Sequence, residues 1–147
     1  MVVSYDRIFN DFLQKITEYK FLSLPVSTRN EIVDGYMRHA INQFSTVCRE
    51  PVEAFDDEEE TVAMVNDIDE YEFIDIITDG MVFYWFKQFM YAEENLKNQL
   101  NTADFSTYSP AELLKQVKAA YDQCKKDFTA RLRKYSYDHG DLTALHI

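Results

Sequence analysis

Residues 69–89 read DEYEFIDIITDGMVFYWFKQF, and this stretch decides the fold. Asp69 can cap a helix, with Glu72 three residues later, as at a capped helix start. The residues that follow are apolar on nearly every side of a helix, which predicts a buried central helix. A strand over 81–86 is the alternative, but about 20 residues without a turn signal favour a helix. Trp85 could belong to an aromatic cage, although core packing is the preferred interpretation.

The composition around this helix also favours long helices. The chain has 147 residues but only three Gly and three Pro, which leaves few backbone breakers and excludes a glycine-rich phosphate loop. Its length fits one domain that buries a sizeable core. Hydrophobic residues make up 46% and aromatic residues 15%, which excludes an acidic disordered chain.

Two helices are predicted before the central one. The first covers residues 5–20, with Ser4 as its N-cap and apolar side chains at three- and four-residue spacing. The second begins at the capping box 28–31 and runs to about Val47. Gly35 lies inside it, and we interpret this glycine as a close helix–helix contact rather than a functional hinge.

A fourth helix follows the central one. The sequence Ser-Pro-Ala-Glu at 109–112 supplies an N-cap, a proline at the first helical position and a closing carboxylate. The apolar stripe then continues for some 25 residues and predicts an end before Tyr137. Between the two helices, residues 93–100 continue helically or as a short turn, and 101–108 form a connector.

Residues 48–66 are the least regular part of the chain. Pro51 and the run DDEEE at 56–60 interrupt the helical periodicity, while TVAMV at 61–65 favours a strand. The prediction here is an acidic loop or a small β-hairpin arm. The fold class is therefore all-α, a single-domain bundle of about four main helices (1–136) with this loop or arm and a C-terminal tail (137–147).

The net charge of −11 is unevenly distributed. Residues 50–79 contain 13 acidic side chains and no Lys or Arg, so the other 117 residues have a net charge of +2. Residues 115–134 contain seven basic and two acidic side chains. These segments could form a head-to-tail contact between copies, pair within one subunit, or simply be solvated. Nucleic-acid binding by the whole chain is disfavoured.

The two cysteines and the N-terminus indicate a soluble intracellular protein. Cys48 and Cys124 stand apart from any metal-site spacing, and Cys124 lies on an apolar stripe, which predicts a buried reduced thiol. A disulfide between the two cysteines is the alternative. The N-terminus has no basic region followed by an apolar one, so no signal peptide is expected. The longest strongly apolar run, 81–86, is six residues and cannot span a bilayer.

No catalytic constellation is favoured over a structural interpretation. The carboxylates of 56–60 could bind a divalent cation but lack alternating ligand positions and a turn glycine. A second metal possibility, weaker still, is the set of Asp138, His139, Asp141 and His146 near the C-terminus. His39 fits a helix boundary better than a general base, and no local motif assembles a triad. We therefore expect a non-enzymatic protein without a metal or other cofactor.

Three stretches carry a family resemblance: ITDGMVFYWFKQFM at 77–90, LNTADFSTYSPAELLKQVK at 100–118 and YSYDHGDL at 135–142. Together they resemble the helical head–tail connector proteins (adaptor or neck proteins) of tailed phages. The resemblance implies a virion protein, assembled in the host cytoplasm, that forms a ring of about a dozen copies on the portal protein. Its other partner would be the next neck or tail protein. DNA would pass through the extended channel without specific binding, and no membrane would be involved.

The resemblance also implies candidate site residues. The C-terminal segment becomes the portal-docking tail, with the alternative that it packs on its own bundle or frays: Tyr137, Asp138, His139, Gly140, Asp141, Leu142, Leu145 and Ile147. The acidic run matches no motif of these proteins, and its role is inferred from charge instead, as are the basic residues below. We expect it to face either the channel lumen or the basic helix of a neighbouring subunit: Asp56, Asp57, Glu58, Glu59 and Glu60. The basic candidates for the subunit contact are Lys118, Lys125 and Arg133.

Two other function classes stay open. One is an intracellular acidic regulator that mimics nucleic acid or binds a basic protein. The other is a small metal-dependent enzyme. The number of copies in the complex separates the acidic regulator from a connector. A ring subunit assembles with copies of itself, whereas a regulator binds its partner as a monomer. Tight, stoichiometric metal binding would support the enzyme.

Overall fold

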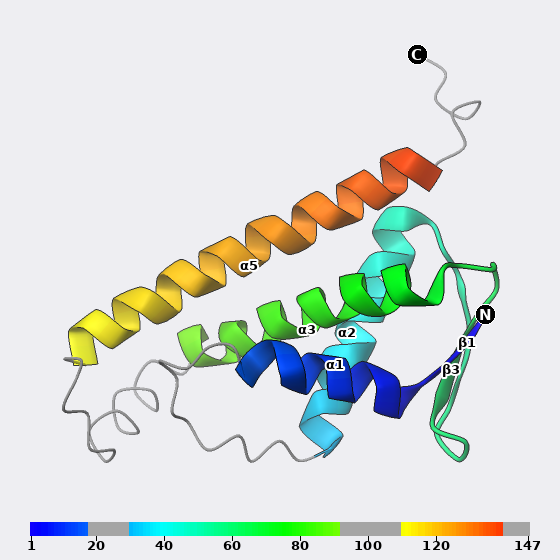
Figure 1. The fold of residues 1–147 in the computed structure, drawn as a ribbon, viewed down its shortest axis with the longest axis horizontal. Coiled ribbons are helices and arrows are strands. Elements are labelled where there is room, and N and C mark those ends of the chain that lie inside the picture. The colour runs from blue at the N-terminus through cyan, green and yellow to red at the C-terminus, as the bar shows by residue number, and fades with distance from the viewer. Residues whose placement is uncertain (18–29, 92–109, 140–147) are drawn as a thin grey trace.

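The computed structural model describes residues 1–17, 30–91 and 110–139. Within these ranges the elements are β1 (Val2–Ser4), α1 (Tyr5–Thr17), α2 (Asn30–Cys48), β2 (Val52–Asp56), β3 (Thr61–Met64), α3 (Glu70–Tyr91) and α5 (Pro110–His139). Figure 1 shows a helical bundle with a small sheet at one end. The predicted helical bundle with a small hairpin is confirmed.

Helix α3 is the centre of the bundle, as its sequence predicts. It contacts α1, α2 and α5, so its apolar side chains are covered from several directions. Asp69 caps it, because its Oδ2 accepts a hydrogen bond from the Glu72 N–H at 3.0 Å. Its buried side chains include Phe73, Ile74, Ile76, Ile77, Met81, Val82, Trp85 and Phe86, so Trp85 is a core residue.

Helix α1 runs beside α3, and its start matches the prediction. Ser4 Oγ accepts a hydrogen bond from the Asp6 N–H at 3.2 Å, which is the expected N-cap. The sequence analysis did not predict that residues 2–4 form strand β1. Three residues are too few to show a period-2 pattern, and this segment is a strand because β3 lies beside it.

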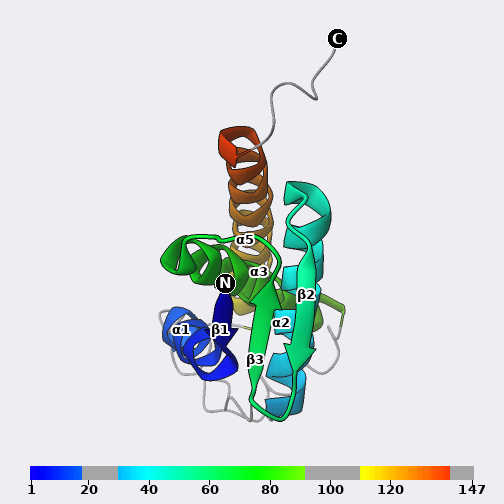
Figure 2. The ribbon, with the colours of Figure 1, turned by 90° about the vertical axis from the view of Figure 1, so that its right-hand side faces the viewer.

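The sheet is antiparallel, with β3 between β1 and β2. Strands β2 and β3 form the hairpin that was one of the two predictions for this region. The hairpin is not a detached arm, since Val62 and Met64 are buried and the Met64 N–H donates to the Met1 carbonyl at 2.8 Å. Figure 2 shows β1 on the side of α1 and β2 in front of α2.

A left-handed residue ends α2 and turns the chain toward β2. Arg49 has a φ of 54°, and the Glu50 N–H donates to the Ser45 carbonyl at 3.2 Å. This six-to-one hydrogen bond is that of a Schellman motif, in which glycine is the usual left-handed residue. The arrangement places Glu50 beside the end of α5.

Helix α5 has 30 residues, so it is about 45 Å long, and it lies across α3 (Figure 1). Its buried side is apolar and includes Val117, Cys124, Phe128, Leu132 and Tyr135. The predicted end before Tyr137 was wrong, because the helix continues to His139. The His139 ring stacks on Tyr135 with a centroid separation of 4.1 Å, which holds the last turn in place.

The two glycines inside helices have opposite environments. A Cβ at Gly80 would lie 2.6 Å from Phe128 Cζ and 3.0 Å from Ala40 Cβ, so α3, α5 and α2 meet closely there. A Cβ at Gly35 would meet no atom of a described residue within 4 Å. The interpretation of Gly35 as a helix–helix contact was therefore wrong. That role belongs to Gly80.

Candidate functional site

The acidic run lies at the end of the β2–β3 hairpin, and we call residues 56–60 the acidic turn. Asp56 Oδ1 accepts hydrogen bonds from the Glu58 and Glu59 N–H groups, both at 3.1 Å. Glu60 has a φ of 53°, and its carbonyl accepts the Tyr5 N–H at 2.8 Å. The turn therefore has one defined backbone conformation, joined to the start of α1.

Asp57 points back into the subunit. Its carboxylate forms an ion pair with Arg38 and accepts a hydrogen bond from the Tyr5 hydroxyl at 3.1 Å. Arg38 is held in turn by Asp34, at 2.8 Å, and by the ring of Phe55. Burial, with a further contribution from the Asp57 hydrogen bond, raises the pKa of Tyr5 to about 12. Asp57 is thus a structural residue of the turn.

The other carboxylates of the turn point outward. The side chains of Glu58, Glu59 and Glu60 are exposed and form no hydrogen bond or ion pair with any described residue. Two further carboxylates among residues 50–79, those of Glu53 and Asp67, are also exposed and have no hydrogen bond or ion pair with a described residue. The sheet end of the molecule consequently has an excess of uncompensated negative charge.

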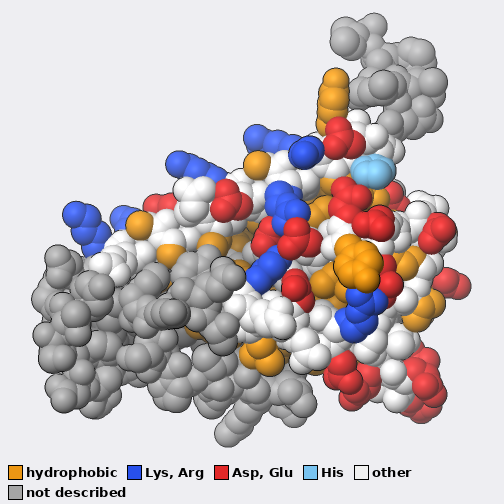
Figure 3. Space-filling view, in the orientation of Figure 1, with side chains coloured by type: hydrophobic (Ala, Val, Ile, Leu, Met, Phe, Trp, Pro, Cys, Tyr) orange, Lys and Arg blue, Asp and Glu red, His pale blue; other side chains and the backbone are white. Residues whose placement is uncertain are grey.

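The second surface is the outer side of α5. Opposite its buried stripe, this helix exposes six cationic side chains, which we call the basic ridge: Lys115, Lys118, Lys125, Lys126, Arg133 and Lys134. None of them forms an ion pair with another described residue. The structure thus places Lys118, Lys125 and Arg133 on one continuous exposed surface, as predicted from their spacing. Figure 3 shows Lys and Arg side chains projecting along the upper edge of the molecule.

Arg131 belongs to a different group of charges on the inner side of α5. It pairs with Asp75 and Asp79 of α3, and Lys15 of α1 reaches the same carboxylates at 2.7 and 2.8 Å. Part of the acidic segment therefore pairs with basic residues of the same subunit. This was one of the alternatives that the sequence left open.

The charges of this network stabilise one another. Partial burial opposes ionisation of Asp75, but hydrogen bonds from Arg131 and Lys15 outweigh it and hold its pKa below the ordinary value. Burial likewise disfavours the Lys15 cation, yet the bonds to Asp75 and Asp79 leave its pKa raised. Thr78, fully buried, accepts a hydrogen bond from Lys15 and lies 2.6 Å from Asp11 Oδ2.

Our sequence analysis did not identify this network, although a signal for it existed. Asp75, Thr78 and Asp79 are polar residues at i, i+3 and i+4 in a helix that is otherwise largely apolar. This spacing gives one polar stripe on the central helix. A polar stripe on a buried helix requires partners, and Lys15 and Arg131 supply them.

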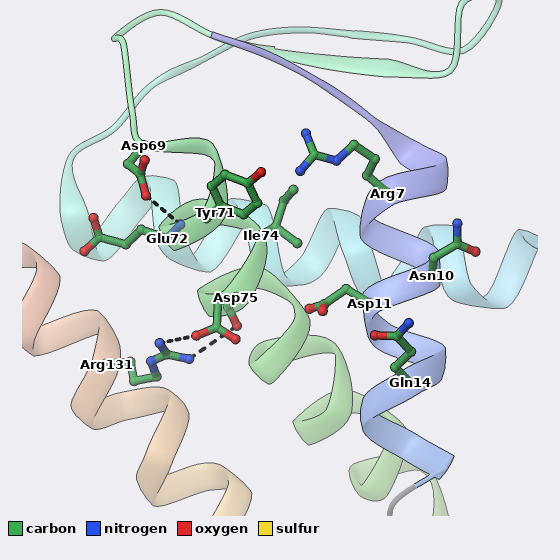
Figure 4. A pocket seen from close by; sticks show the side chains of 10 residues that line it. All are labelled: Arg7, Asn10, Asp11, Gln14, Asp69, Tyr71, Glu72, Ile74, Asp75 and Arg131. Atoms are coloured by element: carbon green, nitrogen blue, oxygen red, sulfur yellow. Dashed lines mark hydrogen bonds and ion pairs between the residues drawn. The ribbon is translucent and has the colours of Figure 1, made fainter.

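A groove of about 710 Å³ lies between α1 and α3, with Arg131 entering from α5 (Figure 4). Its charged walls are largely neutralised from within. Arg7 pairs with Glu70, Arg131 with Asp75, and Asp69 caps α3. Tyr71 stands at its rim, 76% exposed, with the Arg7 guanidinium over its ring. Most charged groups that line the groove therefore already have a partner among the described residues.

The C-terminal end of α5 is attached to the sheet end of the bundle. The Tyr135 hydroxyl donates to Glu50 at 3.0 Å, and His139 lies 3.6 Å from Glu72. Tyr137 projects outward and is 76% exposed. Of the proposed docking tail, Tyr137, Asp138 and His139 are thus part of α5. Its other residues lie outside the described part of the chain: Gly140, Asp141, Leu142, Leu145 and Ile147.

The remaining candidates show no catalytic arrangement. Among residues 1–17, 30–91 and 110–139, no three His, Cys, Asp or Glu side chains are grouped to hold a metal ion. His39 is exposed, with its ring 5.5 Å from that of Tyr84. Cys48 and Cys124 are buried and reduced, and burial raises the pKa of Cys48 to about 12. None of the described helices has the length and apolar character needed to cross a membrane.

Comparison with known proteins adds no relative to this description. No protein-family model, curated protein or solved structure matches the chain. The two uncompensated charged surfaces are therefore the features from which a function can be argued.

Proposed function

We propose that this chain is a structural head–tail connector subunit of a tailed phage, which forms a ring on the portal and extends the DNA channel. One observation carries the proposal. The chain exposes an acidic surface and a basic surface, each without an intramolecular partner among the described residues. The resemblance of residues 77–90, 100–118 and 135–142 to connector proteins supports the same function.

The two surfaces are far apart on the subunit. Figures 1 and 2 both place the turn of the hairpin on the lower side of the molecule and α5 along its upper side. Opposite charges on opposite sides favour contacts in which one copy presents its acidic surface to the basic surface of the next. Such a contact is heterologous, and it generates a ring when the rotation between copies closes.

The proposed portal contact lies at the C-terminal end of α5. This end is held by the contacts of Tyr135 and His139, so the last turn of α5 has a defined position. The exposed ring of Tyr137 adds an aromatic side chain of the type enriched at protein interfaces. The proposed docking segment therefore starts from a rigid base.

The distribution of carboxylates favours a connector over a nucleic-acid mimic. A mimic needs many uncompensated carboxylates in a row, to imitate successive phosphates. Here Asp57, Glu70, Asp75 and Asp79 pair with cations of the same subunit. Within the described residues of 50–79, the carboxylates without any partner are the three of the acidic turn and those of Glu53 and Asp67. An acidic surface of this size fits a protein contact or a channel wall that repels DNA.

Imaging with the portal tests this function. The purified chain is mixed with the portal protein from the same gene cluster and examined by negative-stain electron microscopy and size-exclusion chromatography. We expect an added ring of density coaxial with the portal channel. A chain that stays monomeric and never associates with the portal would overturn the proposal. A monomer in the absence of portal would not, because ring subunits can assemble only on their template.

A further inference from the structure

We propose that the acidic turn of one copy docks in a depression on the basic ridge of a second copy. This inference rests on the proposed ring and names the two surfaces that would join neighbouring subunits. Only the central and C-terminal cations of the basic ridge would take part in the contact. The acidic turn would lie in the subunit contact and not in the channel lumen.

The depression has a volume of about 470 Å³ and lies on the outer side of α5. Small side chains, Thr129 and Ala130, lie between the longer side chains that surround it. The cations around it are Lys125, Lys126 and Arg133, while Asp122 is the one acidic lining residue. Its lining therefore has a net charge of +2, and its shape leaves room for a protruding group.

The acidic turn has the fixed conformation and the negative charge needed to occupy this depression. Its backbone is held by Asp56 and its position by the pairing of Asp57 with Arg38. Because the backbone of the turn already has one conformation, it would lose little conformational entropy on docking, which lowers the free-energy cost of the contact. Glu58, Glu59 and Glu60 would bring three carboxylates to the three cations of the depression.

The turn does not face the depression of its own subunit, so the occupant that we propose is the turn of a second copy. The turn and α5 lie on opposite sides of the subunit, with the bundle between them (Figures 1 and 2). Each copy would use its turn toward one neighbour and its ridge toward the other. The contact involves exposed charges, and the screening length is about 10 Å at 0.1 M salt, so assembly should weaken as salt is raised.

Two charge-reversed variants test the pairing. The turn variant carries Glu58→Lys, Glu59→Lys and Glu60→Lys; the ridge variant carries Lys125→Glu, Lys126→Glu and Arg133→Glu. All six side chains are exposed, so we expect both variants to keep the wild-type circular dichroism spectrum. On portal particles, each variant alone should lose ring formation, because both of its surfaces then have the same sign. The equimolar mixture should recover it, since each contact again joins opposite charges, and so should a chain with all six changes.

Matched controls reverse exposed charges outside the acidic turn and the basic ridge. Glu53→Lys with Asp67→Lys, and Arg49→Glu, should leave ring formation unchanged. If either charge-reversed variant forms rings as the wild type does, the inference is wrong. Rings of the turn variant that retain DNA would instead place the acidic turn in the lumen. Single variants that fail and are not recovered by mixing would also overturn it.

The two proposals fail differently. A wild-type ring on the portal together with unaffected charge variants refutes the docking inference and leaves the connector function standing. A wild-type chain that never assembles on the portal refutes both.

Discussion

Gly35 and Gly80 both lie inside helices with ordinary helical backbone, but packing requires only one of them. At Gly80 the ring of Phe128, 3% exposed, occupies the space where a Cβ would be. At Gly35 that space is empty. A glycine in a helix interior lowers helix stability by about 1 kcal/mol relative to alanine, so the two positions should respond oppositely to the same change.

We expect Gly80→Ala to lower the free energy of unfolding by about 1–3 kcal/mol, because the new Cβ overlaps a buried ring that cannot move freely. Gly35→Ala, the matched control, should raise it by about 1 kcal/mol. Urea denaturation followed by Trp85 fluorescence measures both. A neutral or stabilising Gly80→Ala would show that α5 is not packed against α3 as described.

Single residues also show how far spacing predicts a site. Lys125 and Arg133 lie on one exposed surface, as their positions on a helix predict. Residues 56–60 are five consecutive acidic residues, but Asp57 differs from Glu58–Glu60. Its carboxylate contacts Arg38 and Tyr5 of the same subunit, whereas theirs have no partner among the described residues. Those partners are distant in sequence, so no local pattern announces them.

At the scale of elements, the attachment of α5 to α3 depends on both an apolar stripe and the Arg131 network. The network has a definite pH dependence. The pKa of Asp75 in the folded protein lies below its ordinary value of 3.8, so the unfolded chain binds the proton more readily. Its contribution to stability is complete well above pH 3.8 and is lost as pH falls below that value.

Asp75→Asn should therefore be less stable than the wild type at pH 7, and the difference should shrink between about pH 5 and pH 2. Urea midpoints at several pH values test this. Asp122→Asn, at an exposed carboxylate without a described partner, should show no such difference at any pH. A deficit in Asp75→Asn that stays constant down to pH 2 would contradict the proposed linkage.

Element starts were easier to predict than element ends. Ser4 and Asp69 cap helices because the hydrogen bonds involved span only two or three residues, and this information is local. The continuation of α5 to His139 depends on stacking and on Glu72 of another helix. Strand β1 exists only because β3 lies beside it. Long-range contacts of this kind leave no periodicity in the segment itself.

At the scale of the whole molecule, the described residues form a core of their own before the C-terminal tail begins. The buried hydrophobic residues of the described chain run from Val3 to Tyr135, and all lie in or beside the helices and the sheet. Leu142, Leu145 and Ile147 lie beyond this core in the sequence. We therefore expect that residues 141–147 can be removed with little effect on the fold of the described residues.

Deletion of residues 141–147 should leave the helical circular dichroism signal and the unfolding midpoint near the wild-type values. The same deletion should abolish portal binding, because the apolar side chains proposed to dock are gone. Co-sedimentation with portal particles measures binding. A chain with these seven residues in shuffled order, which keeps composition and length, should also fail to bind. Undiminished binding by the truncated chain would refute the docking role of the tail.

By itself, the sequence determined the helical class, the buried central helix, two helix caps and the position of the excess negative charge in residues 50–79. These follow from periodicity, capping and composition, which act over a few residues. Only the tertiary structure decided which charges remain uncompensated. Asp57, Asp75 and Asp79 are neutralised by Arg38, Lys15 and Arg131, whereas Glu58–Glu60 and the basic ridge are not. The physical reason is that charge pairing depends on which helices pack together, and packing joins residues far apart in the chain.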